Sequence, residues 1–290
     1  RQRVLVPSFV GSNPAAPACF SSRDFIGVPS RVTSQIATAV VLAAGQGKRM
    51  KSELPKVLHT VCGRPMLHYV LEAIAAVHPE RTVVVLGHGH EQVAPHLPAG
   101  CMVALQDRQL GTGHAVLAAA EHILPGPLLV LPGDTPLVTG EVLWKLVAEH
   151  AESGAAATVL TMELDDPTGY GRIVRDTDGS VLYIVEHRDA SAEEQAIREV
   201  NSGMYVLTAP LALEILAGVE SDNDQGEVYL TDVIAGLRAR GEKVSASRVG
   251  DPTLVLGVNS QEELAAAEAL MARREVGPDR ASRPTTVREQ

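Results

Sequence analysis

Two glycines and a cluster of cations follow the first apolar run of the chain. Gly45 and Gly47 allow the backbone to turn sharply, so that amide N–H groups can point at phosphate oxygens. Four basic residues lie within the nine positions from Lys48 to Lys56, and Pro55 restricts the backbone just before Lys56. Two glycines alone favour a plain tight turn, but the restrained lysine favours a phosphate-binding loop. The third glycine of a dinucleotide fingerprint and the Gly-Lys-Ser ending of a P-loop are missing, so neither of those identities follows.

Asp134 is a candidate ligand for a metal ion. It follows the apolar run that ends at Leu131, at the place where open α/β sheets hold their ligands. A carboxylate there suits Mg²⁺, which prefers oxygen ligands and bridging phosphates, although an isolated Gly-Asp more often makes a turn or caps a helix. His88, His90 and His96 follow another apolar run, but no further ligands stand at metal-binding spacing, so we interpret them as part of a solvated loop.

Composition and charge limit the partners of the chain. Of 290 residues, 45% are apolar and 21% charged, as in globular proteins, and only 3% are aromatic. The net charge of −10 argues against nucleic acid and membrane surfaces as partners, because polyanions are bound by basic fields. Cys19, Cys62 and Cys101 are odd in number and form no CxxC pair, which predicts neither disulfides nor zinc. We expect a reducing, cytoplasmic location.

Apolar periodicity predicts strands and helices in alternation from Ile36 onward. Buried strands separated by helices imply an α/β fold with a Rossmann-like, mostly parallel sheet flanked by helices. A turn signal at Asp178-Gly179 predicts a small antiparallel insertion. The predicted strands are 36–43, 82–86, 102–105, 128–131, 157–162, 172–175, 181–185, 200–207, 243–249 and 254–258, and the predicted helices are 66–77, 113–123, 141–150, 227–240 and 261–274.

The glycine loop is the first of several sequence blocks that resemble one family. LAAGQGKRM (42–50) and LPKVLHTVCGRPM (54–66) are similar to the signature of the sugar-nucleotide pyrophosphorylases, and specifically to the uridylyltransferase domain of bacterial N-acetylglucosamine-1-phosphate uridyltransferases. Further blocks follow in the family's order: ALQDRQLGTGHA, LPGDTPL, DDPTGYGRI, VEHRDA, REVNSGMY, EVYLTDVI and GVN. So many blocks in one order do not recur by chance.

The resemblance implies roles for individual residues. It makes Arg49 and Lys56 the catalytic cations, and Asp134 and Asn259 the ligands of Mg²⁺. A side-chain amide such as that of Gln106 also suits the edge of a uracil ring. Without the family, Thr112 would be only a helix cap, Glu186 a solvated charge and Asn201 a strand-end residue. The substrate-binding residues implied are Leu42, Ala43, Ala44, Gly45, Lys56, Gln106, Gly111, Thr112, Gly133, Gly171, Glu186, Asn201 and Asn259.

The implied reaction is the formation of UDP-N-acetylglucosamine and pyrophosphate from UTP and N-acetylglucosamine 1-phosphate, a step toward cell-wall precursors. Another sugar 1-phosphate or nucleotide, such as glucose 1-phosphate or dTTP, stays open, as does a non-catalytic module that only binds a nucleotide sugar. The joint presence of Arg49, Lys56, Asp134 and Asn259 disfavours such a module, because binding alone tolerates the loss of one. Pro132 departs from the family, in which some members carry an aromatic residue there.

The sequence also predicts three regions. Residues 1–34 carry four arginines, four prolines and no periodic pattern, and are expected to form a disordered extension. Residues 35–260 are expected to form the nucleotidyltransferase domain. Residues 261–290 are expected to form a helix and a frayed tail. We find no hexapeptide repeat of the β-helix acetyltransferase domain that the family's full-length enzymes carry, and therefore expect a monomer or weak oligomer.

Overall fold

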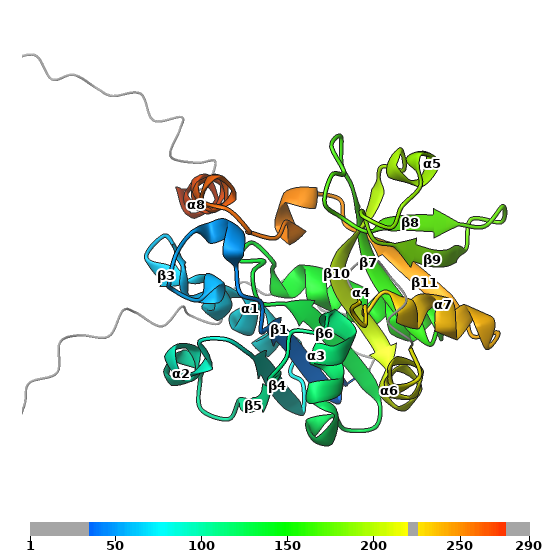
Figure 1. Ribbon diagram of the computed structural model, residues 1–290, viewed down its shortest axis with the longest axis horizontal. Helices are drawn as coiled ribbons and strands as arrows, with labels where there is room; N and C mark the ends of the chain where they lie inside the picture. The colour runs from blue at the N-terminus through cyan, green and yellow to red at the C-terminus, as the bar shows by residue number, and fades with distance from the viewer. Residues whose placement is uncertain (1–34, 220–225, 277–290) are drawn as a thin grey trace, which may run out of the picture. The chain divides into compact units, whose positions relative to one another are not determined.

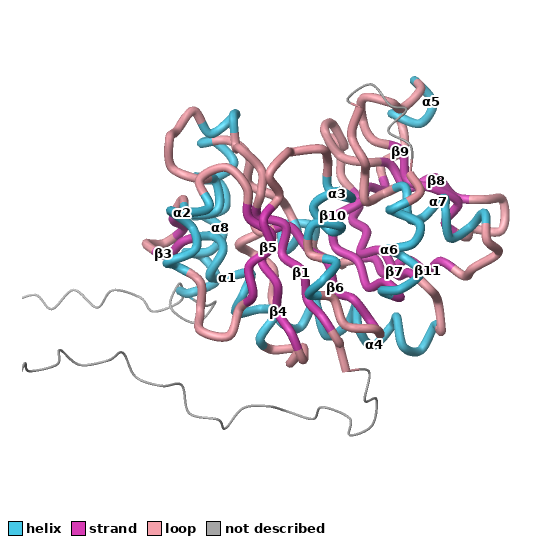
Figure 2. Tube along the Cα trace, turned by 60° about the horizontal axis from the view of Figure 1, so that its bottom comes forward, coloured by secondary structure: helices cyan, strands magenta, loops and turns pink. Residues whose placement is uncertain are grey.

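One mixed β-sheet organises the part of the chain that this computed structural model describes, residues 35–219 and 226–276 (Figure 1). Within that part the sheet has nine strands: β1 (Thr38–Ala43), β4 (Arg81–Leu86), β5 (Met102–Leu105), β6 (Pro127–Pro132), β7 (Ala157–Glu163), β8 (Arg172–Arg175), β9 (Val181–Val185), β10 (Glu199–Thr208) and β11 (Val244–Arg248). The main path runs in the order β11-β7-β10-β6-β1-β4-β5, and β8 and β9 attach to β10. The edge strand β5 and the β8–β9 pair therefore lie toward opposite ends of the sheet (Figure 2).

The central strands form because their residues are apolar and largely β-branched. β1 pairs in parallel with β4 and β6, β4 with β5, and β7 with β11. β10 runs antiparallel between β6 and β7. Strands that are buried on both faces show continuous apolar runs instead of alternation, and this pattern indicated the parallel sheet. The predicted mostly parallel α/β fold is confirmed.

Helices cover both faces of the sheet because successive strand residues point to opposite sides. Val40 of β1 belongs to one buried cluster and Val41 to the other. α1 (Met66–Ala75) and α4 (Gly140–Ser153) pack together in the cluster of Val41, whereas α3 (Thr112–Ala118), α6 (Ala209–Ala217) and α7 (Asp232–Ala239) pack in the cluster of Val40. α4 begins where Thr139 Oγ1 accepts a bond from Val142 N, and ends at Gly154 in the left-handed region.

The antiparallel insertion is the hairpin of β8 and β9. Its turn contains Gly179 at φ +84°, and Asp178 Oδ1 accepts a bond of 2.8 Å from Ser180 N. The hairpin joins the main sheet where Arg172 pairs with Val200 of β10, and α5 (Ala192–Gln195) follows it. The predicted insertion is confirmed, and it places Gly171 and Glu186 at the two ends of one hairpin.

A second, two-stranded sheet lies next to the C-terminal helix. β2 (Thr60–Val61) pairs with β3 (Arg64–Pro65), and α8 (Gln261–Val276) packs against β2 through Ala267. The predicted C-terminal helix is therefore present. The predicted extension of residues 1–34 and the predicted tail of residues 277–290 lie outside the described residues.

Three predicted elements differ from the structure. The predicted strand 254–258 is wrong: η5 (Pro252–Val255) is a short 3₁₀ helix, because Asp251 caps it with a bond from Thr253 N and Pro252 stands in its first turn. The predicted helix 227–240 starts only at α7, because Val228 bonds through its backbone to Leu110 and Gly113. The predicted helix 113–123 stops at Ala118 and continues as η4 (Ala120–His122).

Four short helical segments complete the described part of the chain. They are η1 (Lys48–Met50), η2 (Lys56–Leu58), α2 (His90–Val93) and η3 (Ala94–His96), of which the last two hold two of the three histidines noted in the sequence. Within residues 35–219 and 226–276, no three or more His, Cys, Asp or Glu side chains are grouped to hold a metal ion. No helix in those same residues has the length and apolar character needed to cross a membrane.

Candidate active site

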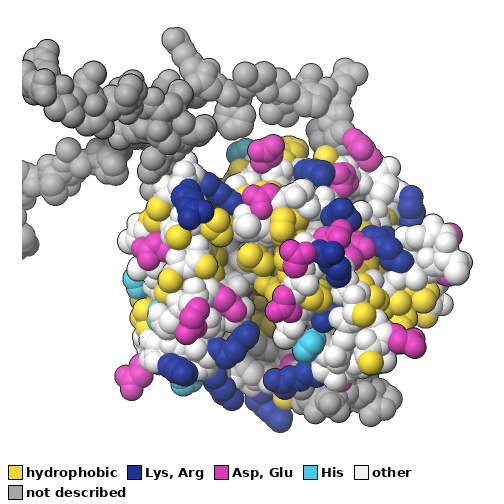
Figure 3. Space-filling model, turned by 90° about the horizontal axis from the view of Figure 1, so that it is seen from above, with side chains coloured by type: hydrophobic (Ala, Val, Ile, Leu, Met, Phe, Trp, Pro, Cys, Tyr) yellow, Lys and Arg dark blue, Asp and Glu magenta, His cyan; other side chains and the backbone are white. Residues whose placement is uncertain are grey.

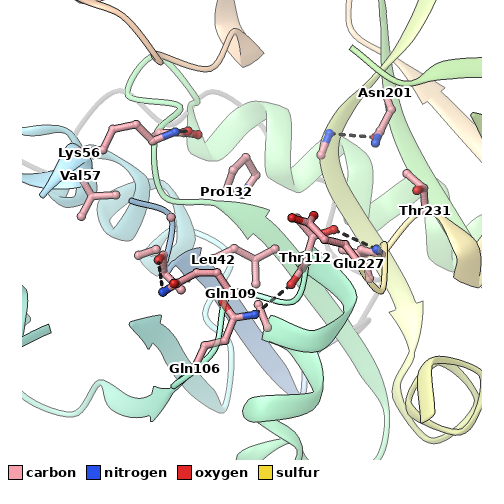
Figure 4. A pocket seen from close by; sticks show the side chains of 18 of the residues that line it. Leu42, Lys56, Val57, Gln106, Gln109, Thr112, Pro132, Asn201, Glu227 and Thr231 are labelled. Atoms are coloured by element: carbon pink, nitrogen blue, oxygen red, sulfur yellow. Dashed lines mark hydrogen bonds and ion pairs between the residues drawn. The ribbon is translucent and has the colours of Figure 1, made fainter. Parts of the chain in front are cut away.

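A cavity of ≈ 340 Å³ opens beside the carboxyl ends of β1 and β6, where an open α/β sheet places its ligands. Lys56 and Asn201 lie on opposite sides of it in Figure 4, and Pro132 stands between them in that view. The structure thus brings together predicted residues from nearly 160 positions of sequence. Those that line the cavity are Leu42, Ala43, Ala44, Gly45, Lys56, Gln106, Gly111, Thr112, Asp134, Glu186 and Asn201.

A second cavity of ≈ 620 Å³ adjoins the first and shares Gly45 and Lys56 with it. Arg49 and Asn259, the other two polar residues of the predicted site, line this second cavity. The remaining predicted residues are glycines that hold the cavity walls in place. Gly133 N donates to Leu42 O at 2.9 Å, and a Cβ on Gly133 would touch three atoms of β1 at 3.3 Å.

The glycine loop is shaped around Lys56. Gly47 adopts φ +61°, and a Cβ at this position would lie 2.8 Å from the Cβ of Lys56. Both the left-handed backbone and the close approach therefore require glycine. Pro55, at φ −51°, precedes η2, and the Lys56 that follows it lines both cavities.

Asp134 and Asn259 meet at the ammonium of Lys56. Lys56 Nζ forms an ion pair with Asp134 Oδ2 and donates to Asn259 Oδ1 at 2.9 Å. The main chain supports this approach, since Val258 N donates to Asp134 O at 2.9 Å and Gly257 lies next to both side chains. A carboxylate oxygen of Asp134 and the amide oxygen of Asn259 thus face the position that the Lys56 ammonium occupies. That donor set fits Mg²⁺, which takes one or two protein oxygens and leaves the rest to phosphates and water.

Gln106 and Thr112 form the wall next to the glycine loop. Gln106 is 4% exposed, and its Nε2 donates to Gly111 O at 3.0 Å and lies 3.0 Å from His114 Nδ1. Thr112 Oγ1 accepts a bond of 2.9 Å from Leu230 N, so its hydroxyl ties α3 to the following wall instead of capping the helix. Gly111, at φ +102°, has no room for a side chain, because a Cβ would lie 2.4 Å from Val228 O.

Asn201 occupies a bulge in β10, where the register with β7 shifts between Asn201 and Tyr205. Gly203 N donates to Asn201 Oδ1 at 2.9 Å, and Asn201 Nδ2 donates to the hydroxyl of Tyr205. Asn201 N also donates to Gly171 O at 2.9 Å, which brings the start of the β8–β9 hairpin to the bulge. Burial raises the pKa of Tyr205, so its hydroxyl stays protonated.

Glu186 lies next to Gly171 and faces Thr231. Thr231 Oγ1 donates to Glu186 Oε1 at 3.1 Å, and a Cβ on Gly171 would lie 3.5 Å from Glu186 Oε2. Burial raises the pKa of the Glu186 carboxyl, and the nearby Asp189 and Asp232 raise it further, whereas the bond from Thr231 lowers it. The structure therefore brings Gly171, Glu186 and Asn201 close together.

Several lining residues were missed by the sequence analysis. Glu227, Leu230 and Thr231 line the first cavity, but their segment was interpreted as the start of a helix. The signal was the block EVYLTDVI itself, whose order among the family blocks marked a site without giving its local structure. Gln109 was missed because only the flanking residues Gln106 and Gly111 carried an argument; its Nε2 donates to Ala44 O at 3.4 Å.

Charge is distributed unevenly around the two cavities. Lys48, Arg49, Lys56 and Arg108 line the second cavity, with Glu227 as the carboxylate among the described residues there. On the face in Figure 3 acidic and basic side chains are interspersed over most of the surface, and several Lys and Arg side chains lie along its lower edge. The second cavity is thus a local basic field on a chain of net charge −10, and it suits an anionic ligand.

Comparison with known proteins places this site in context. Residues 39–177 match the MobA-like NTP transferase domain family. The bifunctional protein GlmU of Geobacillus thermodenitrificans is 50% identical over 235 residues, which cover 80% of this chain and 51% of that protein. GlmU of Thermobifida fusca is 48% identical over 247 residues, covering 82% and 51%. The chain therefore spans about half the length of the curated relatives that it matches.

Solved structures share the fold at low sequence identity. A UDP-glucose pyrophosphorylase complexed with UDP-glucose superposes with a TM-score of 0.69 at 19% identity, covering 83% of this chain and all of that one. An inositol-1-phosphate CTP transferase from T. maritima superposes with a TM-score of 0.66, also at 19% identity, covering 83% and 97%. These likenesses concern the arrangement of the sheet and its helices.

Proposed function

We propose that the chain carries a nucleotidyltransferase domain related to that of bacterial GlmU proteins, and that it is a uridylyltransferase. Its substrates in this proposal are UTP and N-acetylglucosamine 1-phosphate, and its products are UDP-N-acetylglucosamine and pyrophosphate. One observation carries the proposal most of all: the glycine loop, the Lys56, Asp134 and Asn259 cluster, and the Glu186 and Asn201 wall meet around adjoining cavities.

The proposed reaction is a direct displacement at phosphorus. An ionised phosphate oxygen of the sugar phosphate attacks the α-phosphorus of UTP, a new O–P bond forms, and the bond to the leaving pyrophosphate breaks. Neither a protein nucleophile nor a general base is needed, because the attacking phosphate is already ionised near neutral pH. The protein then acts by positioning the two substrates and by neutralising charge. Arg49 and Lys56 are the residues to which we assign that neutralisation.

The two walls divide the substrates between them in this proposal. The backbone of the glycine loop, with Gln106, Gly111 and Thr112, holds the uridine end of the nucleotide. Glu186 and Asn201 offer a carboxylate and an amide to the hydroxyl and acetamido groups of the sugar, and Gly171 allows close approach.

Members of the nucleotidyltransferase family generally use a divalent metal ion. We propose Mg²⁺ here, held by Asp134 and Asn259, whose oxygens both face the Lys56 ammonium. When bound, Mg²⁺ would neutralise phosphate charge and orient the triphosphate. Lys56, freed from its partners, would then be able to bind a phosphate oxygen.

We also propose residues 35–260 as the catalytic domain, with α8 packed beside it. We also propose a cytoplasmic location, because three cysteines without a CxxC pair predict no disulfide framework.

A coupled pyrophosphate-release assay tests the proposed function. UTP, CTP and dTTP are each combined with N-acetylglucosamine 1-phosphate and with glucose 1-phosphate, with and without Mg²⁺. We expect rapid, Mg²⁺-dependent release only from UTP with N-acetylglucosamine 1-phosphate. A clear preference for another pair would correct the substrates, and absence of release from every pair would overturn the activity.

A further inference from the structure

Three cations of the second cavity are left without a charge partner. Within residues 35–219 and 226–276, neither Lys48 nor Arg49 nor Arg108 forms an ion pair or a side-chain hydrogen bond. Five arginines of the chain differ in this respect, since each pairs with a carboxylate: Arg64, Arg175, Arg198, Arg240 and Arg248. Glu227 reduces the positive charge of the cavity but does not cancel it.

Arg108 reaches this cavity from a different part of the chain than the other two cations. It lies on the loop between β5 and α3, and this loop is fastened to the glycine loop by Gln109. Gln109 Nε2 donates to Ala44 O at 3.4 Å, and Gln46 Nε2 donates to Gln109 Oε1 at 3.3 Å. The neighbouring Leu110 O accepts a bond of 2.8 Å from Val228 N. Arg108 is therefore held on a second wall, separate from Lys48 and Arg49.

We propose that Arg108 is a further substrate-binding residue, which binds the β- and γ-phosphates of the nucleoside triphosphate and retains the pyrophosphate as it leaves. This rests on the proposed function. Lys56 stands at the shared edge of the two cavities, whereas Lys48, Arg49 and Arg108 line the second cavity alone, so a triphosphate that extends past Lys56 meets these three cations. A guanidinium suits this task because its fork of N–H donors matches the oxygens of a phosphate group.

Calorimetric titration with inorganic pyrophosphate, UTP and UMP tests this role. UMP lacks the β- and γ-phosphates, so it reports on the uridine end alone. We expect Arg108→Ala to weaken the binding of pyrophosphate and UTP about tenfold, the loss of one charge-assisted contact, and to leave UMP unchanged. Arg108→Lys should recover part of the loss, because it restores the charge without the fork. Arg240→Ala, which removes another exposed arginine, paired with Glu214, should leave the binding of all three ligands unchanged.

Two results would overturn the proposal: unchanged pyrophosphate binding in Arg108→Ala, or an equal loss of UMP and pyrophosphate binding. Circular dichroism of each variant shows whether the fold is kept, and Arg108→Lys serves as the second variant if Arg108→Ala does not fold. The test is separable from the proposed function, because pyrophosphate is the common product of every nucleotidyl transfer. A chain that prefers another nucleotide would still show the loss of pyrophosphate binding, and the role of Arg108 would stand.

Discussion

The two sides of this site, the phosphate side and the sugar side of our proposal, are built in different ways. The phosphate side is formed largely by one contiguous segment, from Leu42 to Lys56, whose backbone and exposed cations face the cavities. The sugar side takes Gly171, Glu186 and Asn201 from the two ends of a hairpin and from a bulged strand, and their polar atoms are bonded to one another or to the adjacent wall.

The two sides differ in whether protein contacts hold their polar side chains in place before a ligand binds. Lys48, Arg49 and Arg108 have no charge partners among the described residues, so an anion can bind without first breaking protein contacts. Asn201 and Glu186 are oriented before any ligand arrives, by Tyr205 and Thr231 respectively. We therefore expect substitutions on the phosphate side to act mainly through charge and turnover, and those on the sugar side through the KM for the sugar phosphate.

The largest effect is expected at Asp134, where the two sides meet. Asp134→Ala removes the carboxylate that faces the cation position and should lower kcat by about 10³-fold, as expected for loss of a main electrostatic contact in the transition state. Asp165→Ala, which removes an exposed aspartate paired with Arg198, is the matched control and should keep full activity. Near-normal Mg²⁺-dependent pyrophosphate release from Asp134→Ala would show that the metal assignment is wrong.

Gly47→Ala tests whether the glycine loop is required for the position of Lys56. The added Cβ would lie 2.8 Å from Lys56 Cβ, and a displacement of the lysine by such a contact should lower kcat about 100-fold. Gly241→Ala is the control, since Gly241 also has positive φ, at +77°, but no atom within 4 Å of the added Cβ. Urea unfolding should show that the free energy of unfolding falls by about 1–2 kcal/mol in both variants. If kcat were the same in both variants, the contact with Lys56 would have no effect on turnover, and only the strain of the left-handed backbone would distinguish them from the wild type.

Glu186→Gln tests the buried carboxylate of the sugar side. The pKa of Glu186 is raised from 4.5, so its protonated form favours the folded state. Its contribution to the free energy of unfolding is present below pH 4.5 and is lost as the pH rises through the raised pKa. The free energy of unfolding, measured with denaturant between pH 4 and 8, should therefore decline less with rising pH for Glu186→Gln than for the wild type.

The same variant should raise the KM for N-acetylglucosamine 1-phosphate about tenfold, because one charge-assisted hydrogen bond is lost, and leave the KM for UTP unchanged. A rise in the KM for UTP alone would contradict the division between the two sides.

The smallest effect is expected at Tyr205. Tyr205→Phe removes the acceptor of the Asn201 side-chain bond at a cost of about 1 kcal/mol, and should raise the KM for the sugar phosphate two- to threefold, about half of that cost. Because burial raises the pKa of Tyr205, the effect should be constant between pH 6 and 9. Tyr183→Phe removes the bond that Tyr183 of β9 donates to Glu194 of α5, and it should leave the KM values for the sugar phosphate and for UTP unchanged. A larger effect of Tyr183→Phe would place the sugar elsewhere.

The local geometry of the proposed phosphate side follows from the sequence more directly than that of the proposed sugar side, for physical reasons. Gly45, Gly47 and Lys56 are close in sequence, so their spacing alone carries the geometry of a loop. Buried apolar runs likewise predicted the parallel sheet, because burial on both faces leaves a local pattern. The contact of Gly171 with the bulge at Asn201 depends on pairing between β8 and β10, which no local pattern specifies.

The same limit explains the elements that were predicted wrongly. The segment 227–231 is apolar enough to continue a helix, but Val228 N donates to Leu110 O and Gly113 N donates to Val228 O, and these bonds keep the segment out of the helix. Residues 254–258 have the composition of a strand, yet Asp251 and Pro252 start a 3₁₀ turn that carries Asn259 toward Asp134. In both places a tertiary or capping contact outweighs intrinsic propensity, and in both the result shapes the site.

A crystal structure with a non-reactive UTP analogue, Mn²⁺ and N-acetylglucosamine 1-phosphate tests the division of the site most directly. We predict an anomalous Mn²⁺ peak between Asp134 and Asn259, a triphosphate in the cavity of Arg49 and Arg108, and the sugar against Glu186 and Asn201. A sugar bound at the glycine loop, or a triphosphate that extends along the β8–β9 hairpin, would contradict the account.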